Sequence, residues 1–266
     1  MGVVDCDNLL LLLGVPTEMS PEERNIVNEL LMRGFQECAA KAGTSVRGGQ
    51  TVYNPWLLIG GVATSVLPDS DFIMPNQAEA DSVLVLTKPL GTQLAVNGYN
   101  WMQDSSNVWK EKLASRISPE DLKSLYKAAT FSMARLNRNG KFACTDVTGF
   151  GLLGHARNLA AVQSAAVLFE LTCLPCLAGV RHLSHGLAER HHLDTGLTPE
   201  TSGGLLVVLP SKSAEAYCQD LLEADGTPAW IVGRVLPASD PSEARTARLS
   251  PDLTFLEVPH ASMILK

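Results

Sequence analysis

The stretch Ala143 to His155 reads ACTDVTGFGLLGH and decides the fold around it. Small residues end a strand at the carboxylate Asp146, glycines follow, and apolar residues then recur at helical spacing. This order predicts a strand, a tight turn and the N-terminus of a helix. Such a terminus carries unpaired N–H groups and a partial positive charge, which attract anions. An Asp held beside it can bind a hard cation that a phosphate also contacts.

A simpler structural explanation stays open for the same residues. Asp and Thr are favoured at the N-cap position, so Asp146 or Thr148 could serve only to cap the helix. Short glycine motifs also match frequently by chance. This stretch alone therefore does not decide between a cap and a site for a metal and a phosphate.

Composition sets the class of protein. The chain has 266 residues, of which 45% are hydrophobic and 18% charged, as in an ordinary globular protein of one or two domains. The net charge of −7 argues against a general nucleic-acid-binding surface. No segment reaches the roughly 18 apolar residues that span a bilayer, and the short run Leu9 to Leu13 follows acidic residues, unlike a signal peptide. We therefore expect a cytoplasmic protein that binds neither nucleic acid nor membrane.

Cysteine and histidine invite metal interpretations, which the spacing does not favour. Six cysteines without a secretory signal suggest free thiols in a reducing compartment. Cys173 and Cys176 form a lone C-x-x-C, without the second pair typical of a zinc site. For the histidines we expect a solvated helix face and loop; they are His182, His185, His191 and His192.

The order of predicted elements indicates an α/β (α+β) fold in two units, residues 1–77 and 78–266, with a linker near 68–80. Residues 9–15 resemble a central strand that is apolar on both faces, so we expect further strands of its sheet to lie upstream. We expect helices over 20–42, from 92, over 118–140, 177–187 and 211–224. We expect strands over 9–15, 44–51, 56–67, 82–87, 143–146, 166–171 and 205–209, and a final strand pair over 229–236 and 244–249.

Two further glycine segments allow both a structural and a functional interpretation. Gly48 and Gly49 could form only a bulge, or could bring the backbone close to a phosphate, with Gln50 and Thr51 as extra donors. The polar turn at 199–204 could bend only for the fold, or could face the same cleft as Asp146. Gly60 and Gly61 predict a bulge or a close approach. Lys88, before another glycine turn, could contact an anion, although a solvated loop lysine is the simpler expectation.

Taken together, five separated motifs resemble selenophosphate synthetase of the eukaryotic type, within the aminoimidazole ribonucleotide synthetase-like superfamily. They occur in the order of that family, and an ordered set is far more specific than a single motif. The motifs are MGVVDCDNLLLLLGV, GTSVRGGQTVYNPW, LTKPLGTQ, TDVTGFGLLGH and PETSGGLL.

The resemblance implies a two-domain fold whose amino-terminal domain pairs with its copy in a homodimer, here with that domain incomplete. It implies a phosphotransferase (selenide, water dikinase) that makes selenophosphate, AMP and phosphate from ATP, selenide and water, with Mg²⁺, for selenocysteine synthesis. Carried over by motif, Gly48, Gly49, Gln50 and Thr51 would contact ATP across the dimer interface. Asp146 would be a magnesium ligand.

Two departures from the family pattern matter. The family's reactive Cys or selenocysteine and its Lys lie ahead of the position that matches Met1, so no catalytic residue is assigned and we expect this chain alone to be inactive. The connection from Arg135 to Cys144 is also shorter than is usual in the family.

Two alternatives stay open. One is another ATP-using synthetase or kinase of the same superfamily. The other, of a different class, is a non-catalytic dimerising homologue that binds other proteins of the selenium pathway. Selenide dependence of AMP release would separate the first alternative from a selenophosphate synthetase.

Overall fold

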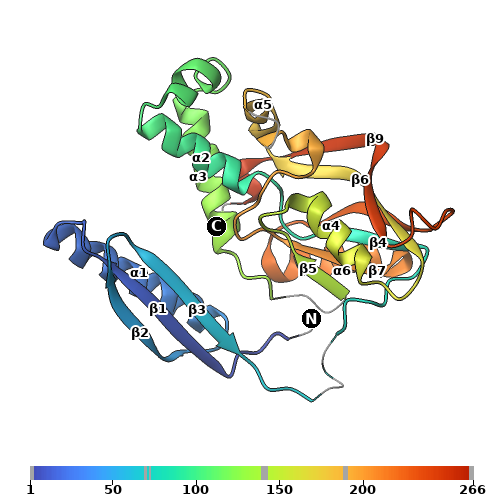
Figure 1. Ribbon diagram of the computed structural model, residues 1–266, viewed down its shortest axis with the longest axis horizontal. Helices are drawn as coiled ribbons and strands as arrows, with labels where there is room; N and C mark the ends of the chain where they lie inside the picture. Colours follow the sequence, from blue (N-terminus) through green and yellow to red (C-terminus); the bar gives the residue numbers. More distant parts are fainter. Residues whose placement is uncertain (1–2, 69–70, 72, 139–142, 188–190, 264–266) are drawn as a thin grey trace. The chain divides into compact units, whose positions relative to one another are not determined.

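The computed structural model describes residues 3–68, 71, 73–138, 143–187 and 191–263. The chain divides into two units, Gly2–Phe72 and Ile73–Lys266, called here the smaller and the larger unit. The division falls within the stretch expected to be a linker, and each unit is described by itself (Figure 1).

The smaller unit is a three-stranded sheet with one long helix. Its elements are β1 (Asn8–Pro16), α1 (Pro21–Lys41), β2 (Val46–Asn54) and β3 (Leu58–Thr64). The strand order is β2-β1-β3, with β1 parallel to β2 and antiparallel to β3. Helix α1 begins with the predicted capping box, in which the Ser20 side chain and Glu23 satisfy each other's backbone N–H groups.

One face of this sheet is open. Since side chains alternate between faces, the registers place Leu12, Val52, Leu58 and Val62 on the face that α1 does not cover, and all four are exposed. Strand β1 is central, as expected, but it is only partly buried within this unit, so the expectation of burial on both faces is wrong here.

The glycines of β3 mark a close approach. Strand β3 pairs with β1 in one continuous register, so the bulge considered at Gly60 and Gly61 is absent. A Cβ placed on Gly61 would lie 3.1 Å from Phe35 Cζ of α1, which explains a glycine at this position.

The larger unit is built on a six-stranded sheet of order β5-β7-β4-β8-β6-β9. All neighbouring pairs are antiparallel except β6 and β9. The last two predicted strands are confirmed as β8 and β9, but they do not pair with each other, because they flank β6 on either side. The strands are β4 (Ser82–Leu86), β5 (Ala143–Asp146), β6 (Val167–Leu177), β7 (Leu205–Pro210), β8 (Trp230–Pro237) and β9 (Thr246–Val258).

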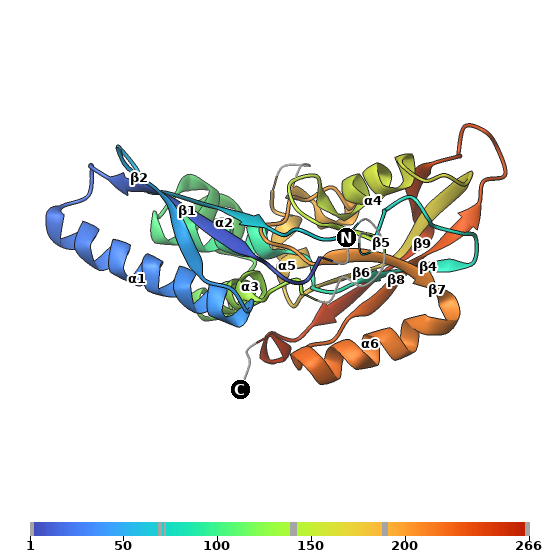
Figure 2. The same cartoon turned by 90° about the horizontal axis from the view of Figure 1, so that it is seen from below.

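Helices cover both faces of this sheet, with α4 and α6 on opposite sides in Figure 2. Alternate residues of β4 and β7 divide between two hydrophobic clusters: Leu84 and Leu206 join the cluster under α4, whereas Val85 and Val207 join the one under α6. The helices are α2 (Thr92–Gln103), α3 (Pro119–Ala134), α4 (Gly151–Ala161), α5 (Val180–Ser184) and α6 (Ser211–Asp225), with short turns at Trp109–Leu113, Leu193–Thr195 and His260–Ser262.

Two predicted helices are shorter in the structure. Helix α3 ends at Ala134, because Arg135 already has an extended backbone, so the predicted end at Gly140 is wrong. The helix expected over 177–187 is reduced to α5, because β6 continues through Pro175 to Leu177 in parallel pairing with β9. Residues 139–142 of the short connection before β5 lie outside the described residues.

Candidate functional site

Asp146 is the last residue of β5, an edge strand of the larger sheet, and it is exposed. Within the described part of the chain its carboxylate makes no hydrogen bond or ion pair. Both oxygens are therefore available to a ligand from solution.

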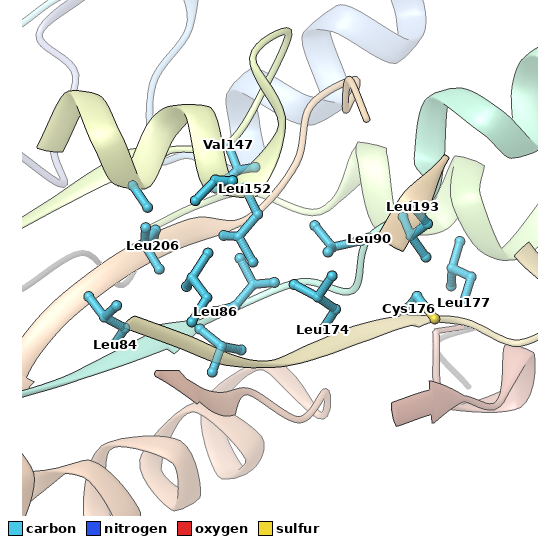
Figure 3. Packing of buried hydrophobic residues seen from close by; sticks show 14 of the residues in the cluster. Leu84, Leu86, Leu90, Val147, Leu152, Leu174, Cys176, Leu177, Leu193 and Leu206 are labelled. Atoms are coloured by element: carbon cyan, nitrogen blue, oxygen red, sulfur yellow. The ribbon is translucent and has the colours of Figure 1, made fainter. Parts of the chain in front are cut away.

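The turn that follows Asp146 is tightly held. The Val147 side chain is buried in the hydrophobic cluster together with Leu152 of α4 (Figure 3). The Val147 N–H donates to the Gly204 carbonyl at 2.9 Å, and the Thr148 carbonyl accepts the Glu200 N–H at 2.9 Å. The backbone that follows the exposed Asp146 carboxylate is thus held in place by hydrogen bonds and by the buried Val147 side chain.

Helix α4 is not capped by either residue considered for that role. Its N-cap is Phe150, and no side chain makes a capping hydrogen bond. The capping explanation for Asp146 and Thr148 is therefore wrong.

The N-terminus of α4 is also less open than the sequence suggested. The Gly151 N–H donates to the Thr148 carbonyl and the Leu153 N–H to the Gly196 carbonyl. The N–H groups of Gly149 and Phe150 make no hydrogen bond to any described residue. Both residues are exposed and follow Asp146 by three and four positions, and a Cβ on Gly149 would meet nothing within 4 Å.

His155 supports the turn from the first part of α4. It is buried, and its Nε2 accepts the Thr148 N–H at 2.9 Å and lies 3.2 Å from Thr148 Oγ1. An Nε2 that accepts a backbone N–H must be unprotonated. Burial lowers the pKa of His155, against the opposing influence of the Asp146 charge, and so favours this neutral form.

The 199–204 turn packs directly against the Asp146 turn. A Cβ on Gly203 would collide with the Val147 carbonyl, and a Cβ on Gly204 would lie 2.5 Å from the backbone nitrogen of Lys88. Both glycines are therefore required by close backbone approach. The structure packs this turn against the Asp146 turn, and the interpretation that both face one cleft stays a prediction.

Glu200, which the sequence did not single out, is a buried acid at this junction and is only 4% exposed. Its Oε1 accepts the Gly91 N–H at 2.7 Å, and its Oε2 accepts the Thr92 N–H at 2.8 Å and the Thr92 hydroxyl at 2.5 Å. Burial raises the pKa of Glu200 to about 7, although these donors oppose the shift. The carboxylate occupies the position that an external anion would take at the N-terminus of α2.

Lys88 is not the solvated loop lysine that the sequence suggested, since only 1% of it is exposed. Its Nζ donates to the carbonyls of Arg135 at 2.6 Å and Ser202 at 3.1 Å. Burial, aided by the nearby Arg135 charge, lowers the pKa of Lys88 to about 8. Lys88 therefore stabilises the 199–204 turn through its hydrogen bond to the Ser202 carbonyl. Its buried amine is not accessible to an anion from solution.

Gly48 to Thr51 lie on β2 in the smaller unit and are exposed. The pairing of β1 with β2 shifts between Leu9 and Leu10, whose partners are Val46 and Gly48, so the strand is irregular at this glycine. Gly49 has φ +146°, and a Cβ there would collide with the Leu11 carbonyl. The backbone alone thus explains Gly49, and the role of these four residues in nucleotide binding stays a prediction.

The cysteines and histidines form no metal site among the described residues. Cys173 and Cys176 lie in β6, where residues three apart point to opposite faces of the sheet. Asp194 pairs with both Arg181 and His185, at 2.8 and 3.2 Å.

The chain is similar in sequence to known proteins. Residues 79–243 match the family described as AIR synthase related protein, C-terminal domain. The chain is 42% identical to a selenide, water dikinase of Trypanosoma brucei brucei, covering 97% of this chain and 67% of that protein. It is 44% identical to selenide, water dikinase 2 of Homo sapiens, covering 97% of this chain and 58% of that protein. The chain thus spans roughly two thirds or less of the length of these two relatives.

Solved structures with low identity share the fold. The thiamine-monophosphate kinase from Stenotrophomonas maltophilia superposes with a TM-score of 0.61 at 19% identity, covering 94% of this chain and 73% of that chain. HypE from E. coli gives a TM-score of 0.62 at 18% identity, covering 92% of this chain and 70% of that chain. At these identities the likeness concerns the fold alone. In the described part of the chain, no helix has the length and apolar character needed to cross a bilayer.

Proposed function

Because the chain belongs to the selenide, water dikinase family, we propose that it serves the ATP-dependent synthesis of selenophosphate from selenide. The reaction consumes ATP, selenide and water and yields selenophosphate, AMP and phosphate. The observation that carries the proposal is an exposed Asp146 carboxylate that is followed in the same turn by the N–H groups of Gly149 and Phe150, which have no acceptor among the described residues.

These groups suit a magnesium–nucleotide complex. Mg²⁺ is usually held by one or two carboxylates together with substrate phosphates and water, so a single exposed Asp can be the protein's contribution. When bound, the ion neutralises negative charge that develops on a transferred phosphoryl group. In this proposal Asp146 holds the ion, and the N–H groups of Gly149 and Phe150 donate to phosphate oxygens.

A second contact to the nucleotide would come from Gly48, Gly49, Gln50 and Thr51. Their exposure on β2, an edge strand, supports this role, because an edge strand presents unpaired N–H and C=O groups to a ligand. The Gln50 amide and the Thr51 hydroxyl add side-chain donors.

We further propose that the chain forms a homodimer through the open face of the smaller sheet. Exposed apolar side chains of Leu12, Val52, Leu58 and Val62 on that face support an interface with a second copy. The six cysteines are free thiols, which fits a cytoplasmic enzyme in a reducing compartment.

The first test is nucleotide binding by this chain. Isothermal titration calorimetry with a non-hydrolysable ATP analogue should show binding in the presence of Mg²⁺ and its loss when EDTA removes the ion. No binding in either condition would contradict the proposal, and equal binding in both would contradict the role of the metal.

The second test distinguishes the enzyme from its rivals. In a protein that also carries the reactive Cys or selenocysteine and the Lys of the family, release of AMP from ATP should depend on selenide and not on a ribonucleotide substrate. Dependence on a ribonucleotide would instead identify another synthetase of the superfamily. Nucleotide binding without any turnover, in a protein that dimerises, would favour the non-catalytic homologue.

A further inference from the structure

Glu200 joins two parts of the larger unit that are far apart in sequence. On one side its carboxylate accepts three hydrogen bonds from Gly91 and Thr92, the first residues of the α2 terminus. On the other side its backbone N–H donates to Thr148, in the turn that follows Asp146. A single residue thus connects a helix end to the candidate metal-binding turn.

The carboxylate end of this connection is held firmly. Gly91 has φ +107°, and a Cβ there would lie 2.7 Å from Val180, so the donor backbone has little freedom. The Thr201 N–H donates to Thr92 Oγ1 at 3.0 Å, and Thr92 Oγ1 also lies 3.1 Å from the Thr201 carbonyl oxygen. The groups that bind the Glu200 carboxylate are therefore held in place, and so is the residue that follows it, Thr201.

The backbone end extends this order to the Asp146 turn. Beyond the Glu200–Thr148 bond, Gly204 accepts the Val147 N–H at 2.9 Å, so the 199–204 turn holds two consecutive residues after Asp146. The Asp146 backbone is paired with Leu205 of β7 and accepts from the Thr145 hydroxyl, but its carboxylate makes no hydrogen bond to any described residue. The direction of its carboxylate consequently depends on the backbone that Glu200 and its turn support.

We propose that Glu200 is a positioning residue, which holds the 199–204 turn on the N-terminus of α2 and thereby sets the direction in which Asp146 meets a metal–nucleotide. The metal–nucleotide part of this inference rests on the proposed function. Glu200 touches no substrate in this account and acts only through the Val147–Thr148 backbone.

The chemistry requires a carboxylate at this position. Three donors converge on two oxygens, and both oxygens must accept. Glutamine offers only one acceptor oxygen, so its NH₂ group would face a backbone N–H of Gly91 or Thr92. A buried N–H without an acceptor is unfavourable, and the turn would shift to relieve it.

The chain offers a matched control in Glu170, which is 3% exposed and accepts hydrogen bonds from Arg234 and Arg248. Glu170 lies on β6, which three strands separate from β5. Glu170→Gln therefore removes a buried, hydrogen-bonded carboxylate from the same unit without touching the Asp146 turn.

The experiment compares Glu200→Gln and Glu170→Gln in the whole protein. The measured quantity is the Mg²⁺ concentration at which binding of a non-hydrolysable ATP analogue is half-maximal. Glu200→Gln should raise that concentration about tenfold, as expected for the loss of one buried hydrogen bond. Glu170→Gln should lower the melting temperature but leave the Mg²⁺ dependence unchanged. If both variants lower the melting temperature and neither changes the Mg²⁺ dependence, Glu200 is merely structural and the proposal is wrong.

A second measurement keeps this inference separate from the proposed function. Amide hydrogen exchange at Val147 and Thr148 should accelerate in Glu200→Gln and not in Glu170→Gln, whether or not nucleotide binds. Unchanged exchange at both amides would overturn the positioning role, whereas faster exchange in a protein that binds no nucleotide would overturn only the proposed function. Should Glu200→Gln fail to fold, Thr92→Val, which removes one of the three donors, provides the same comparison with a smaller expected change.

Discussion

Two turns of the larger unit have the same local pattern, a strand followed by a glycine turn and a helix, but the structure uses them differently. Before α2, Glu200 occupies the anion position with its own carboxylate. Before α4, Asp146 is exposed and the N–H groups of Gly149 and Phe150 have no acceptor among the described residues. The comparison teaches that a glycine turn at a helix N-terminus is a ligand site only where the rest of the chain leaves it empty.

The glycines themselves reflect this difference. Gly91 has a positive φ and lies against Val180, so the backbone requires glycine there. Gly149 has neither a positive φ nor a neighbour that a Cβ would meet. A glycine without a structural requirement is more informative about function than one that the fold demands.

Asp146→Asn should have the largest effect on function. The substitution removes the only charge that the α4 turn offers to a cation, so Mg²⁺-dependent nucleotide binding should weaken by about 100-fold or more. The melting temperature should stay unchanged, because the carboxylate has no partner among the described residues. Calorimetric titration and thermal unfolding measure the two quantities, and wild-type affinity in the variant would show that the open turn is not the metal site.

Gly91→Ala should have the largest effect on stability. A left-handed φ disfavours alanine by about 1–2 kcal/mol, and crowding against Val180 adds a similar amount, for a total of about 3 kcal/mol. Denaturant unfolding followed by circular dichroism measures the difference. A loss below about 1 kcal/mol would mean that the α2 turn is not as constrained as this comparison requires.

His155 tests how the open turn is supported. His155→Leu leaves the Thr148 N–H without its acceptor and should destabilise the chain by about 1–2 kcal/mol. His155→Gln, which keeps an acceptor, should recover part of this loss. Equal losses in both variants would indicate that packing, and not the hydrogen bond to Thr148, is what His155 contributes.

The same histidine predicts a pH dependence. Since the pKa of His155 is lowered in the folded protein, the unfolded chain binds the proton more readily, and stability from this group is lost as the pH falls below about 6.5. Urea unfolding between pH 7.5 and 5 should show a shallower loss in His155→Gln than in the wild type. A parallel decline in both proteins would assign the pH dependence to other groups.

Gly149→Ala should have the smallest effect on stability, within about 0.5 kcal/mol, because the added methyl group enters open space. If that space belongs to a nucleotide phosphate, the same variant should nevertheless weaken Mg²⁺-dependent binding. A variant that binds as well as the wild type would remove Gly149 from the proposed site. Comparison with Gly91→Ala tests directly whether one glycine serves the fold and the other serves a ligand.

Local sequence signals predicted most of the elements. The capping box at Ser20, the start of α2 at Thr92 and the start of α3 after Ser118 are all confirmed. At Ser20 and Ser118 the reason is local, because the serine side chain accepts a hydrogen bond from a backbone N–H of the first turn. Family motifs led to the correct family and superfamily fold. Errors concentrated where pairing between distant strands decides the outcome, as in β6, which continues to Leu177 because β9 lies beside it.

The candidate site shows the same limit. Asp146 and its glycine turn were visible as a local motif, but neither the buried state of Lys88 nor the contact of Glu200 with Gly91 and Thr92 leaves a local signal. Those contacts join residues 108 and 109 positions apart in the chain.

The sequence by itself determined the short-range features of this protein: the helix starts, the glycine turns, the strand that ends in Asp146 and the motifs of its family. Only the tertiary structure decided which of two similar turns is filled by Glu200 and which remains open. The physical reason is that a helix N-terminus attracts any nearby negative group, and whether that group is a buried side chain or a ligand depends on which distant residues the fold brings to it.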